Sequence, residues 1–413
     1  MSIMTLVWNY LKARPLNTAI NILLLSLGIA VITTLTLFNK QLEQKITHNS
    51  RGIDLVVGAK GSPLQLILCN IFHIDFPTGN IRLADAEKIA RNRLIKKSIP
   101  LALGDSYRSF RIIGTDRQYS DLYKGELAAG DWWNKSLEVT IGSLVAEQTG
   151  LKMGDRFVSA HGLSEGGHAH NEHQYIVKGI LKSSNSVIDN LILTSVESIW
   201  EMHAEAESHD HDATGAPFIP SPLVAGAAKG DSTKEITSLL VQYRSPMGAI
   251  QLPRMINAQT SLQAASPAFE TARLFSILGV GVDVLTGFAY VLIFISALSI
   301  FIALYNSLKE RRYDMAIMRS MGATRNKLLL TILLEGSLLT FMGTAVGMIL
   351  GHGVIVFLSK AVVQTQKAGI TGFVFYPEEW IILVGSLLLG MLCSIIPAVQ
   401  AYRTDISKVL AGS

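Results

Sequence analysis

Residues 284–308 read VLTGFAYVLIFISALSIFIALYNSL, a run of 25 residues without a charged side chain. A helix needs about 20 predominantly apolar residues to cross the hydrocarbon core of a bilayer. Residues 18–38, 328–358 and 381–402 form three further segments of this kind. Buried core helices are the alternative for any one segment, but four such segments favour transmembrane helices. The sequence therefore predicts an integral membrane α-helical protein with four transmembrane helices.

The composition agrees with this fold class. Hydrophobic residues make up 49% of the 413 residues, and charged residues only 16%, against about 25% in ordinary soluble domains. The mean hydropathy is +0.34, which excludes a disordered chain. The net charge of +4 is small, and no nucleic-acid partner is expected. Segment 18–38 is too long for the apolar region of a secretory signal, and no small-residue cleavage site follows it.

Lysine and arginine near the predicted spans set the orientation, because they favour the cytoplasmic side. They are found in the leader, in residues 309–327 and in the tail, whereas those of residues 359–380 are balanced by glutamates. Both termini and residues 309–327 are therefore expected in the cytoplasm, and residues 39–270 outside. The predicted 1+3 arrangement has these parts: a leader and helix 1, 1–38; an extracytoplasmic α+β domain, 39–270; a stalk and helix 2, 271–308; a cytoplasmic coupling loop, 309–327; helix 3, 328–358; an external loop, 359–380; helix 4, 381–402; and a tail, 403–413.

The large α+β domain is inserted between helices 1 and 2. Short β-branched or aromatic runs bounded by Gly, Asp or Ser predict strands, and the apolar period at 83–95 predicts a helix. Residues 51–115 and 232–260 are expected to form a lobe next to the membrane, and the middle an outer lobe. The predicted strands are 53–57, 99–103, 109–113, 138–141, 175–180 and 238–243; the predicted helices are 40–48, 83–95 and 144–149, the last ending at Gly150.

The chain carries no nucleotide-binding signature of its own. The Gly-x-x-x-x-Gly-Lys-Ser/Thr spacing of a phosphate-binding loop is absent, and residues 58–62, GAKGS, indicate a turn. We therefore expect no ATPase site and no enzyme activity in this chain. Two cysteines, Cys69 and Cys393, are too few for a disulfide framework or a thiolate zinc site.

Seven of the ten histidines lie between residues 161 and 211, interleaved with carboxylates. Imidazole and carboxylate are suitable ligands for zinc and its neighbours, and short His-rich tracts are typical of metal binding. Nearby glycines indicate loops that could surround an ion. A solvated polar loop that binds metal incidentally is the alternative. The candidate zinc ligands are His161, His168, His170, His173, His203, His209 and His211.

The cytoplasmic loop reads KERRYDMAIMRSMGATRNK over residues 309–327. Asp314 can cap a short helix and Gly322 can end it. Met315, Ile317, Met318 and Met321 would give this helix an apolar surface, with Arg319 beside it. Such a helix could lie at the membrane surface or dock into a groove of a cytoplasmic partner.

This loop resembles that of the MacB/FtsX/LolC-like permeases, also called type VII ABC transporter permeases. The shared pattern is a Glu-Arg-Arg run, an acidic residue, a short apolar stretch, Arg and a Gly-Ala pair, here Gly322-Ala323. The likeness continues over most of the chain, although the His-rich region 161–211 departs from it and Ile406 replaces a usual proline. The further matching stretches are Arg14–Leu16, Ile141–Glu147, Leu151–Asp155, Glu335–Gly336 and Pro397–Asp405.

The resemblance implies a subunit of the bacterial inner membrane that works with cytoplasmic ABC ATPase subunits, which use the ATP. It also implies a homodimer, or pairing with a related permease, and an extracytoplasmic substrate-binding or adaptor protein. Motion would pass along the first two helices to the external domain, a mode called mechanotransmission. The ATPase-coupling residues implied are Asp314, Met315, Ile317, Met318, Arg319, Met321, Gly322 and Ala323.

Helix 3 holds the few polar features expected inside the membrane. Ionisable residues at membrane depth are functional candidates, and we expect Glu335 to pair with Arg325 or Lys327. Gly343, Gly347 and Gly351 form two overlapping Gly-x-x-x-Gly motifs, which let another helix approach closely. That helix can belong to the same chain or to a dimer partner.

Three functions fit these features. The first is a permease whose client is zinc or a zinc-carrying protein. The second is export or extraction of a lipoprotein, peptide or other amphiphile. The third is a signalling scaffold that activates an external enzyme and transports nothing.

Overall fold

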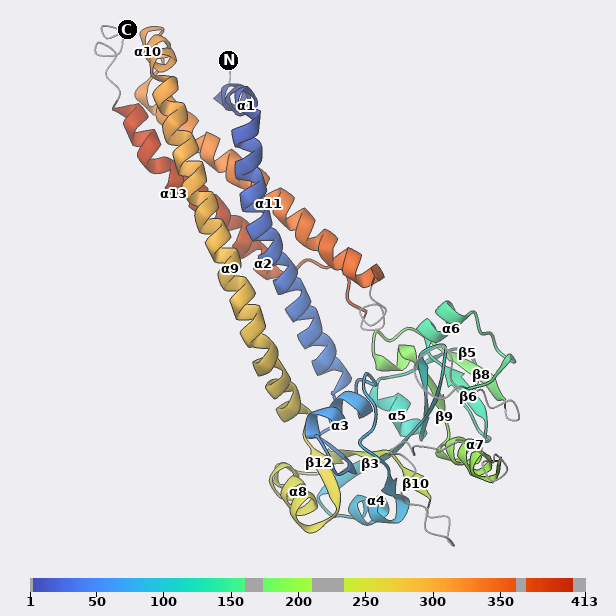
Figure 1. Ribbon diagram of the computed structural model, residues 1–413. Coiled ribbons are helices and arrows are strands. Elements are labelled where there is room, and N and C mark those ends of the chain that lie inside the picture. The colour runs from blue at the N-terminus through green and yellow to red at the C-terminus, as the bar shows by residue number, and fades with distance from the viewer. Residues whose placement is uncertain (1–2, 160–173, 210–233, 362–368, 404–413) are drawn as a thin grey trace, which may run out of the picture. The chain divides into compact units, whose positions relative to one another are not determined.

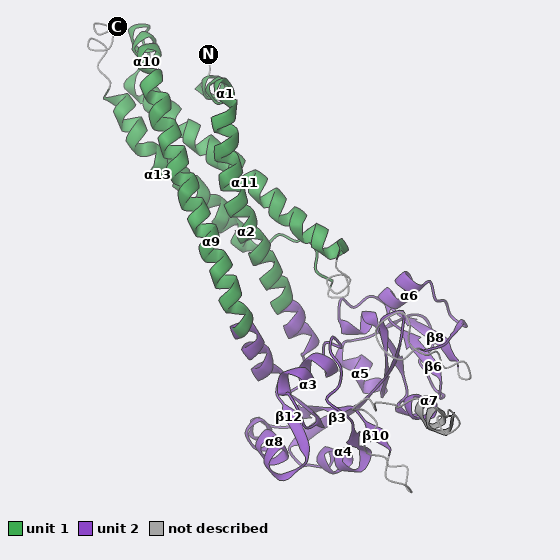
Figure 2. Cartoon of the chain, viewed as in Figure 1, with its two compact units in different colours: residues 1–43, 277–413 green, residues 44–276 purple. Residues whose placement is uncertain are grey.

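The computed structural model describes residues 3–159, 174–209, 234–361 and 369–403, with the side chains of 203–209 left aside. The chain divides into two compact units, shown in Figure 2. We call residues 1–43 and 277–413 the helical unit and residues 44–276 the α/β unit. Two long helices pass from one set of residues to the other, so the α/β unit is an insertion in the helical unit.

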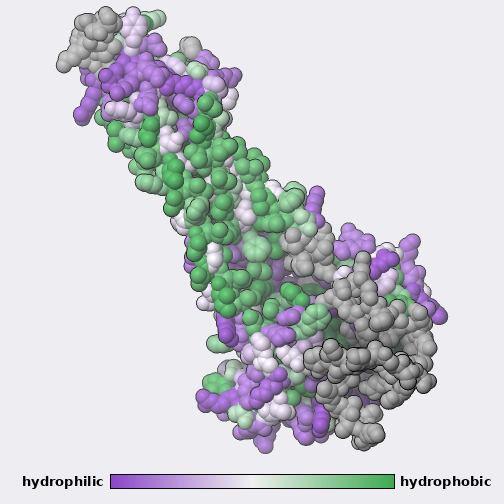
Figure 3. Space-filling view, viewed as in Figure 1, coloured by the Kyte–Doolittle hydropathy of each residue, from purple (hydrophilic) through white to green (hydrophobic). Residues whose placement is uncertain are grey.

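The helical unit contains four helices that are long and apolar enough to cross a membrane, as predicted. Each of the four helices is longer than the apolar segment predicted from the sequence, because polar residues beside that segment are also helical. Apolar side chains cover most of the visible surface of this unit, and hydrophilic ones gather at the end that carries α10 (Figure 3). The four helices are α2 (Pro15–Asn49), α9 (Pro267–Glu310), α11 (Arg325–Ala361) and α13 (Pro377–Tyr402).

Two shorter helices accompany them: α1 (Ile3–Ala13) and α10 (Arg312–Ser320). The first was not expected from the sequence. It is amphipathic, with Val7 and Leu11 buried and Trp8 exposed. The buried pair joins a cluster with Leu25 of α2 and residues of α9 and α11, so α1 is part of the helical core. Figure 1 shows α1 at the N-terminal end of α2.

One mixed sheet forms the centre of the α/β unit. Its strand order is β12-β1-β11-β3-β4-β9-β6-β8-β5, with β7 beside β8. The pairs β4–β9 and β6–β8 are parallel and the other pairs antiparallel. The strands are β1 (Leu55–Ala59), β3 (Ile95–Tyr107), β4 (Phe110–Thr115), β5 (Leu127–Gly130), β6 (Glu138–Ile141), β7 (Arg156–Phe157), β8 (Tyr175–Leu181), β9 (Leu191–Thr194), β11 (Ser238–Tyr243) and β12 (Leu262–Ala265).

Short helices and one small ribbon complete this unit. The ribbon pairs β2 (Ile81–Arg82) with β10 (Glu235–Ile236). The helices are α3 (Pro63–Asn70), α4 (Leu83–Ala90), α5 (Arg117–Leu122), α6 (Ser143–Thr149), η1 (Val187–Asn190), α7 (Val196–His209) and α8 (Pro246–Gln259).

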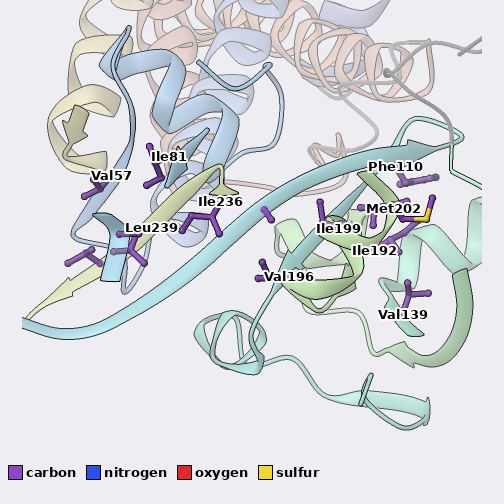
Figure 4. Packing of buried hydrophobic residues seen from close by; sticks show 14 of the residues in the cluster. Val57, Ile81, Phe110, Val139, Ile192, Val196, Ile199, Met202, Ile236 and Leu239 are labelled. Atoms are coloured by element: carbon purple, nitrogen blue, oxygen red, sulfur yellow. The ribbon is translucent and has the colours of Figure 1, made fainter. Parts of the chain in front are cut away.

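Both faces of the sheet are buried, which makes two cores from alternate residues of the same strands. Leu55, Ile112 and Ile192 belong to one core, and their neighbours Val56 and Ile113 to the other. In the first core, Val196, Ile199 and Met202 of α7 pack against strand residues (Figure 4). Because each fully buried aliphatic side chain contributes about 1.5–3 kcal/mol, these two layers account for the integrity of the unit.

The chain enters and leaves the α/β unit on neighbouring strands. The strand that follows α2 is β1, and the strand that precedes α9 is β12. They pair antiparallel, with Val56 opposite Ala265 and Ala59 opposite Leu262. The two connections to the helical unit therefore lie at the same end of one edge ribbon.

Several predicted elements appear with the predicted bounds, and others differ. Strands 138–141 and 238–243 match, and α6 ends at Gly150 with a positive φ of 76°. The helix predicted at 83–95 stops at Ala90, because Arg91 and Asn92 form a turn into β3. The expected grouping of residues 51–115 with 232–260 is seen in the sheet, where β1, β11, β3 and β4 are neighbours and β9, β6, β8 and β5 form the other half. The two groups are not distinct lobes, because the sheet is continuous and both cores contain residues of both groups.

Candidate functional site

The candidate site is α10, the short helix between the second and third spans. It begins at Arg312, so Asp314 lies in its first turn and is not its cap, contrary to our expectation. A carboxylate there still interacts favourably with the positive end of the helix dipole. Gly322 follows the helix with φ 100°, a conformation that side chains with a Cβ disfavour. The N–H of Ala323 bonds to the carbonyl of Met318 at 2.9 Å, which closes this end.

The two faces of α10 have different neighbours. Met315 and Ala316 are buried, and Met318 is half-buried beside them. Met315 and Met318 pack on a cluster from α9, α11 and α13 that contains Leu308, Leu328, Ile332, Ala398 and Ala401. The face of α10 that carries Met315 is thus occupied within the chain.

The opposite face of α10 is open. Tyr313 is 50% exposed, Ile317 37% and Met321 82%. Tyr313 and Ile317 are spaced i and i+4, so they line one side of the helix, and Met321 follows as the residue that caps its C-terminal end. We call these three residues the α10 outer face. Of the four apolar residues predicted to form a docking surface, only Ile317 and Met321 belong to it, and Tyr313 was missed.

A buried ion pair joins the start of α10 to α11. The Nη1 atom of Arg311 lies 3.3 Å from the carboxylate of Glu335, and both side chains are about nine-tenths buried. The predicted partners Arg325 and Lys327 were wrong, because the turn after α9 brings Arg311 over this carboxylate, while Arg325 lies over the ring of Tyr402. Removing one partner of a buried pair typically costs about 3–5 kcal/mol.

Helix α1 contributes to the same cluster. The guanidinium of Arg311 lies 3.7 Å from the centre of the Tyr10 ring, within the range of a cation–π contact. Burial raises the pKa of the Tyr10 phenol, and Arg311 opposes that rise. Arg14, just after α1, forms an ion pair with Glu310. Tyr10 of α1 and the adjacent Arg14 therefore hold the two residues that precede α10.

The three glycines of α11, the third predicted span, pack against α2 in the same chain. A Cβ on Gly343 would meet Leu25, one on Gly347 would meet Ile29, and one on Gly351 would meet Thr33, all at 2.7–2.8 Å. Each glycine thus permits a close approach of two helices. Packing within the chain accounts for the motif.

The candidate zinc ligands are outside the side chains that the structure describes. His161, His168, His170, His173 and His211 lie in segments left out of the description. His203 and His209 lie on helix α7 and not in a loop, and the strand predicted at 175–180, within the His-rich region, is present as β8. Among the described residues, no group of three His, Cys, Asp or Glu side chains could hold a metal ion.

One buried polar cluster in the α/β unit was not predicted. Arg111 of β4, largely buried, donates to the carbonyl of Asp75 and lies over the ring of Phe76. Burial raises the pKa of the nearby Cys69 thiol to about 12, although Arg111 opposes that rise. Burial also lowers the pKa of His73 to about 3, and Arg111 adds to that effect. A protonated thiol and a neutral imidazole make this cluster structural at neutral pH.

Comparison with protein families assigns both units. Residues 18–243 match the model of the MacB-like periplasmic core domain, more than half of the chain. Residues 286–406 match the FtsX-like permease C-terminal model. The chain belongs to the MacB/FtsX-like ABC transporter permeases. The permease contains α10 and the Arg311–Glu335 pair within the second matched region.

Two solved structures of extracytoplasmic regions match part of this chain. The periplasmic region of MacB from Actinobacillus actinomycetemcomitans has 12% identity and a TM-score of 0.34, over 56% of this chain and 98% of that one. The extracellular domain of the noncanonic ABC-type transporter YknZ from Gram-positive bacteria has 13% identity and a TM-score of 0.30, over 52% and 99%. A comparison with curated proteins gives no match.

Proposed function

We propose that a separate cytoplasmic ABC ATPase drives this permease and that α10 docks on it. The α10 outer face is the observation that carries this proposal, because Tyr313, Ile317 and Met321 present an exposed apolar strip on a short helix. Amphipathic helices bind partner proteins by laying such a strip into an apolar groove. ATP hydrolysis then belongs to the partner, and the permease itself performs no catalysis.

The contacts around α10 suit it to pass on a movement. Its inner face is packed against three spans, and the Arg311–Glu335 pair joins its start to α11. Tyr10 and Arg14 connect the same turn to the N-terminal helix. We expect a displacement of α10 to reach α11 and α1 without loss, because packed elements with buried polar links move together.

Mechanotransmission is supported by the continuity of α2 and α9. Each begins in residues of one unit and ends in residues of the other without a break in the helix. A helix transmits axial and rotational displacement along its hydrogen-bonded length. We propose that both serve as stalks through which ATP-driven motion does work in the extracytoplasmic domain.

The permease is proposed to act in the bacterial inner membrane as a homodimer or beside a related permease, with an extracytoplasmic adaptor or substrate-binding protein. Large apolar side chains remain exposed along α9, among them Val280, Val284, Phe288 and Phe294. Lipid or a second subunit would cover such a surface.

Zinc, free or carried by a protein, is the client we propose, on the basis of the seven histidines at 161–211. Imidazole binds metal in its neutral form, so affinity should fall as the pH drops through about 6.5. Calorimetry on the full-length permease near neutral pH compares the wild type with a variant lacking His168, His170, His173, His209 and His211. Equal zinc binding by both proteins would reject these ligands and favour an amphiphile client or a signalling role.

Docking is tested by placing a charge on the α10 outer face. Ile317→Glu and Met321→Glu should each reduce ATPase binding by about tenfold or more, because a carboxylate would be buried in an apolar groove. Ser320→Glu is the matched control, an exposed polar position on the same helix. The measurement is co-purification of the ATPase with the full-length permease, and its stimulated hydrolysis. If the two variants bind like Ser320→Glu, or if the wild type binds no ATPase, docking through α10 is wrong.

A further inference from the structure

The described residues between α11 and α13, 369–376, are fastened to two helices of the helical unit, α2 and α11. Gln41 of α2 donates to the Thr371 carbonyl at 2.8 Å and accepts from the Thr371 N–H at 2.8 Å. Ile370 packs on Leu37 of α2 and on Ile355 of α11. We call residues 370–376 the clasp, because they join α2 to α11.

The clasp lies directly on α11 at Gly372. A Cβ on this residue would be 2.5 Å from the carbonyl oxygen of His352 and 2.6 Å from the side chain of Val356. The backbone of the clasp therefore packs against the helix without space for a side chain. Hydrogen bonds to the clasp hold this contact in place.

His352 provides those bonds. Its Nδ1 lies 2.6 Å from the Gly372 carbonyl oxygen, and its Nε2 lies 2.9 Å from Oε2 of Glu379. The side chains of His352 and Glu379 are only 11% and 3% exposed. Oε1 of Glu379 accepts from the N–H of Tyr376 at 2.9 Å, so this carboxylate is held in place by its own helix start.

Both partners of the imidazole are acceptors when Glu379 is ionised. A neutral imidazole has one N–H and can donate to one of them only. The remaining nitrogen would then direct a lone pair at an oxygen, inside a buried contact. Both bonds are satisfied when the His352–Glu379 pair holds one additional proton.

We propose that His352 and Glu379 form a proton-binding site that keeps the clasp closed on α11. The ligand is a proton, and the site is complete within one chain. When the proton leaves, the single remaining N–H should go to the charged carboxylate, since hydrogen bonds to ionised groups are about twice as strong as neutral ones. The bond to Gly372 is the one lost, and the contact of Gly372 with α11 loosens, while Gln41 still holds Thr371.

The other ionisable groups near the clasp do not replace this site. Lys40 of α2 pairs with Glu378 at 3.0 Å, and both are exposed. Glu43 and the Tyr376 phenol lie near Lys40. Lysine, tyrosine and carboxylate side chains titrate well away from neutral pH in water. The sign follows from the bonds: the clasp is closed at low pH and loosens as the pH rises.

Glu379→Gln is the decisive variant. The amide oxygen can still accept from Tyr376, and the amide N–H₂ can donate to the Nε2 of a neutral His352. The same hydrogen bonds then form without the extra proton. The clasp of this variant should be closed at every pH, while Gly372→Ala should open it at every pH without changing any ionisable group.

The experiment is hydrogen–deuterium exchange of peptides covering 369–376 in the full-length permease in nanodiscs, from about pH 6 to about pH 9. We expect wild-type protection to fall about tenfold as the pH rises, relative to Glu379→Gln at the same pH. Loss of protection by Gly372→Ala verifies the readout.

Nitrogen NMR of labelled histidines gives a second measurement. The His352 signal, identified by its loss in His352→Gln, should show a proton on both ring nitrogens near pH 6. A pH trend shared by the wild type and Glu379→Gln, a wild type without a trend, or an unprotected clasp in Glu379→Gln would each overturn the proposal. So would a His352 ring with a single N–H throughout the range.

Discussion

The Cys69 thiol illustrates how single residues of the permease are set by their surroundings. It is fully buried, and its pKa is raised to about 12. At pH 8 only about one part in ten thousand would then be thiolate, the form that reacts with alkylating agents. In a Cys393→Ala background, we expect no labelling of Cys69 by maleimide in the native permease and full labelling after unfolding, as measured by mass spectrometry. Labelling of the folded protein would contradict this burial.

His73 makes the stability of the α/β unit depend on pH. Its Nε2 lies 2.8 Å from the Tyr119 hydroxyl, and its pKa is lowered to about 3. Between about pH 6.5 and pH 3, the unfolded chain binds a proton that the folded chain does not. Stability therefore falls as the pH drops through this window, by at most about 1.4 kcal/mol per pH unit.

The measurement is thermal unfolding of the permease at a series of pH values. In His73→Asn, which tolerates the positive φ of 54° at this position, the decline between about pH 6 and pH 4 should be shallower than in the wild type. Equal slopes would show that other groups cause the acid sensitivity.

The interaction partners of single side chains were the part of the candidate site that the sequence predicted least well. Glu335 was expected to be paired, but its partner depends on the turn that returns Arg311 over α11. The Arg111 cluster joins α3 and β4, which lie about 40 residues apart, and no local pattern connects them. Helical spacing places Met315 and Met318 on one side of α10, but it does not tell which side meets the body of the protein.

At the scale of elements, the packing of α2 on α11 depends on glycines. A Cβ on Gly347 would lie 2.7 Å from the Cβ of Ile29 and 2.8 Å from the carbonyl oxygen of Ser26, whereas Gly353 on the same helix has nothing within 4 Å. Gly347→Leu should therefore lower the unfolding free energy by about 1–3 kcal/mol. Gly353→Leu should be neutral or slightly stabilising, because leucine favours helix over glycine.

The comparison is made by thermal unfolding of both variants in the same nanodiscs. A melting temperature lowered in Gly347→Leu alone supports the contact. Equal effects of the two substitutions would mean that the close approach of α2 and α11 does not contribute to stability.

Elements with a strong local pattern were predicted well. The four spans follow from length and hydropathy, and β6 and β11 follow from compact β-branched runs. The length of β3 was missed, since Pro100 and Gly104 interrupt its pattern while pairing with β11 and β4 continues it. Short helices such as α3 and α5 owe their stability to tertiary packing, which the sequence does not reveal by itself.

At the scale of the whole molecule, the expected orientation can be tested directly. Lys96 is exposed on β3, and Arg312 is exposed at the start of α10. In a background without the two native cysteines, a membrane-impermeant maleimide added to spheroplasts should label Lys96→Cys and leave Arg312→Cys unlabelled until the cells are opened. The basic residues of the 309–327 loop are the physical reason, since they favour the cytoplasmic side. The reverse labelling pattern would invert the topology.

The edge ribbon of β1 and β12 has a mechanical consequence. Since the stalk helices attach at its same end, equal tension on both would carry the ribbon as one piece and leave its hydrogen bonds unloaded. Unequal tension would shear Val56 against Ala265 along the strand direction. The hydrogen bonds between β1 and β12 would then be loaded by the difference between the two forces and not by their sum. The inserted domain would therefore be insensitive to a displacement of the whole helical unit, which pulls on both helices equally.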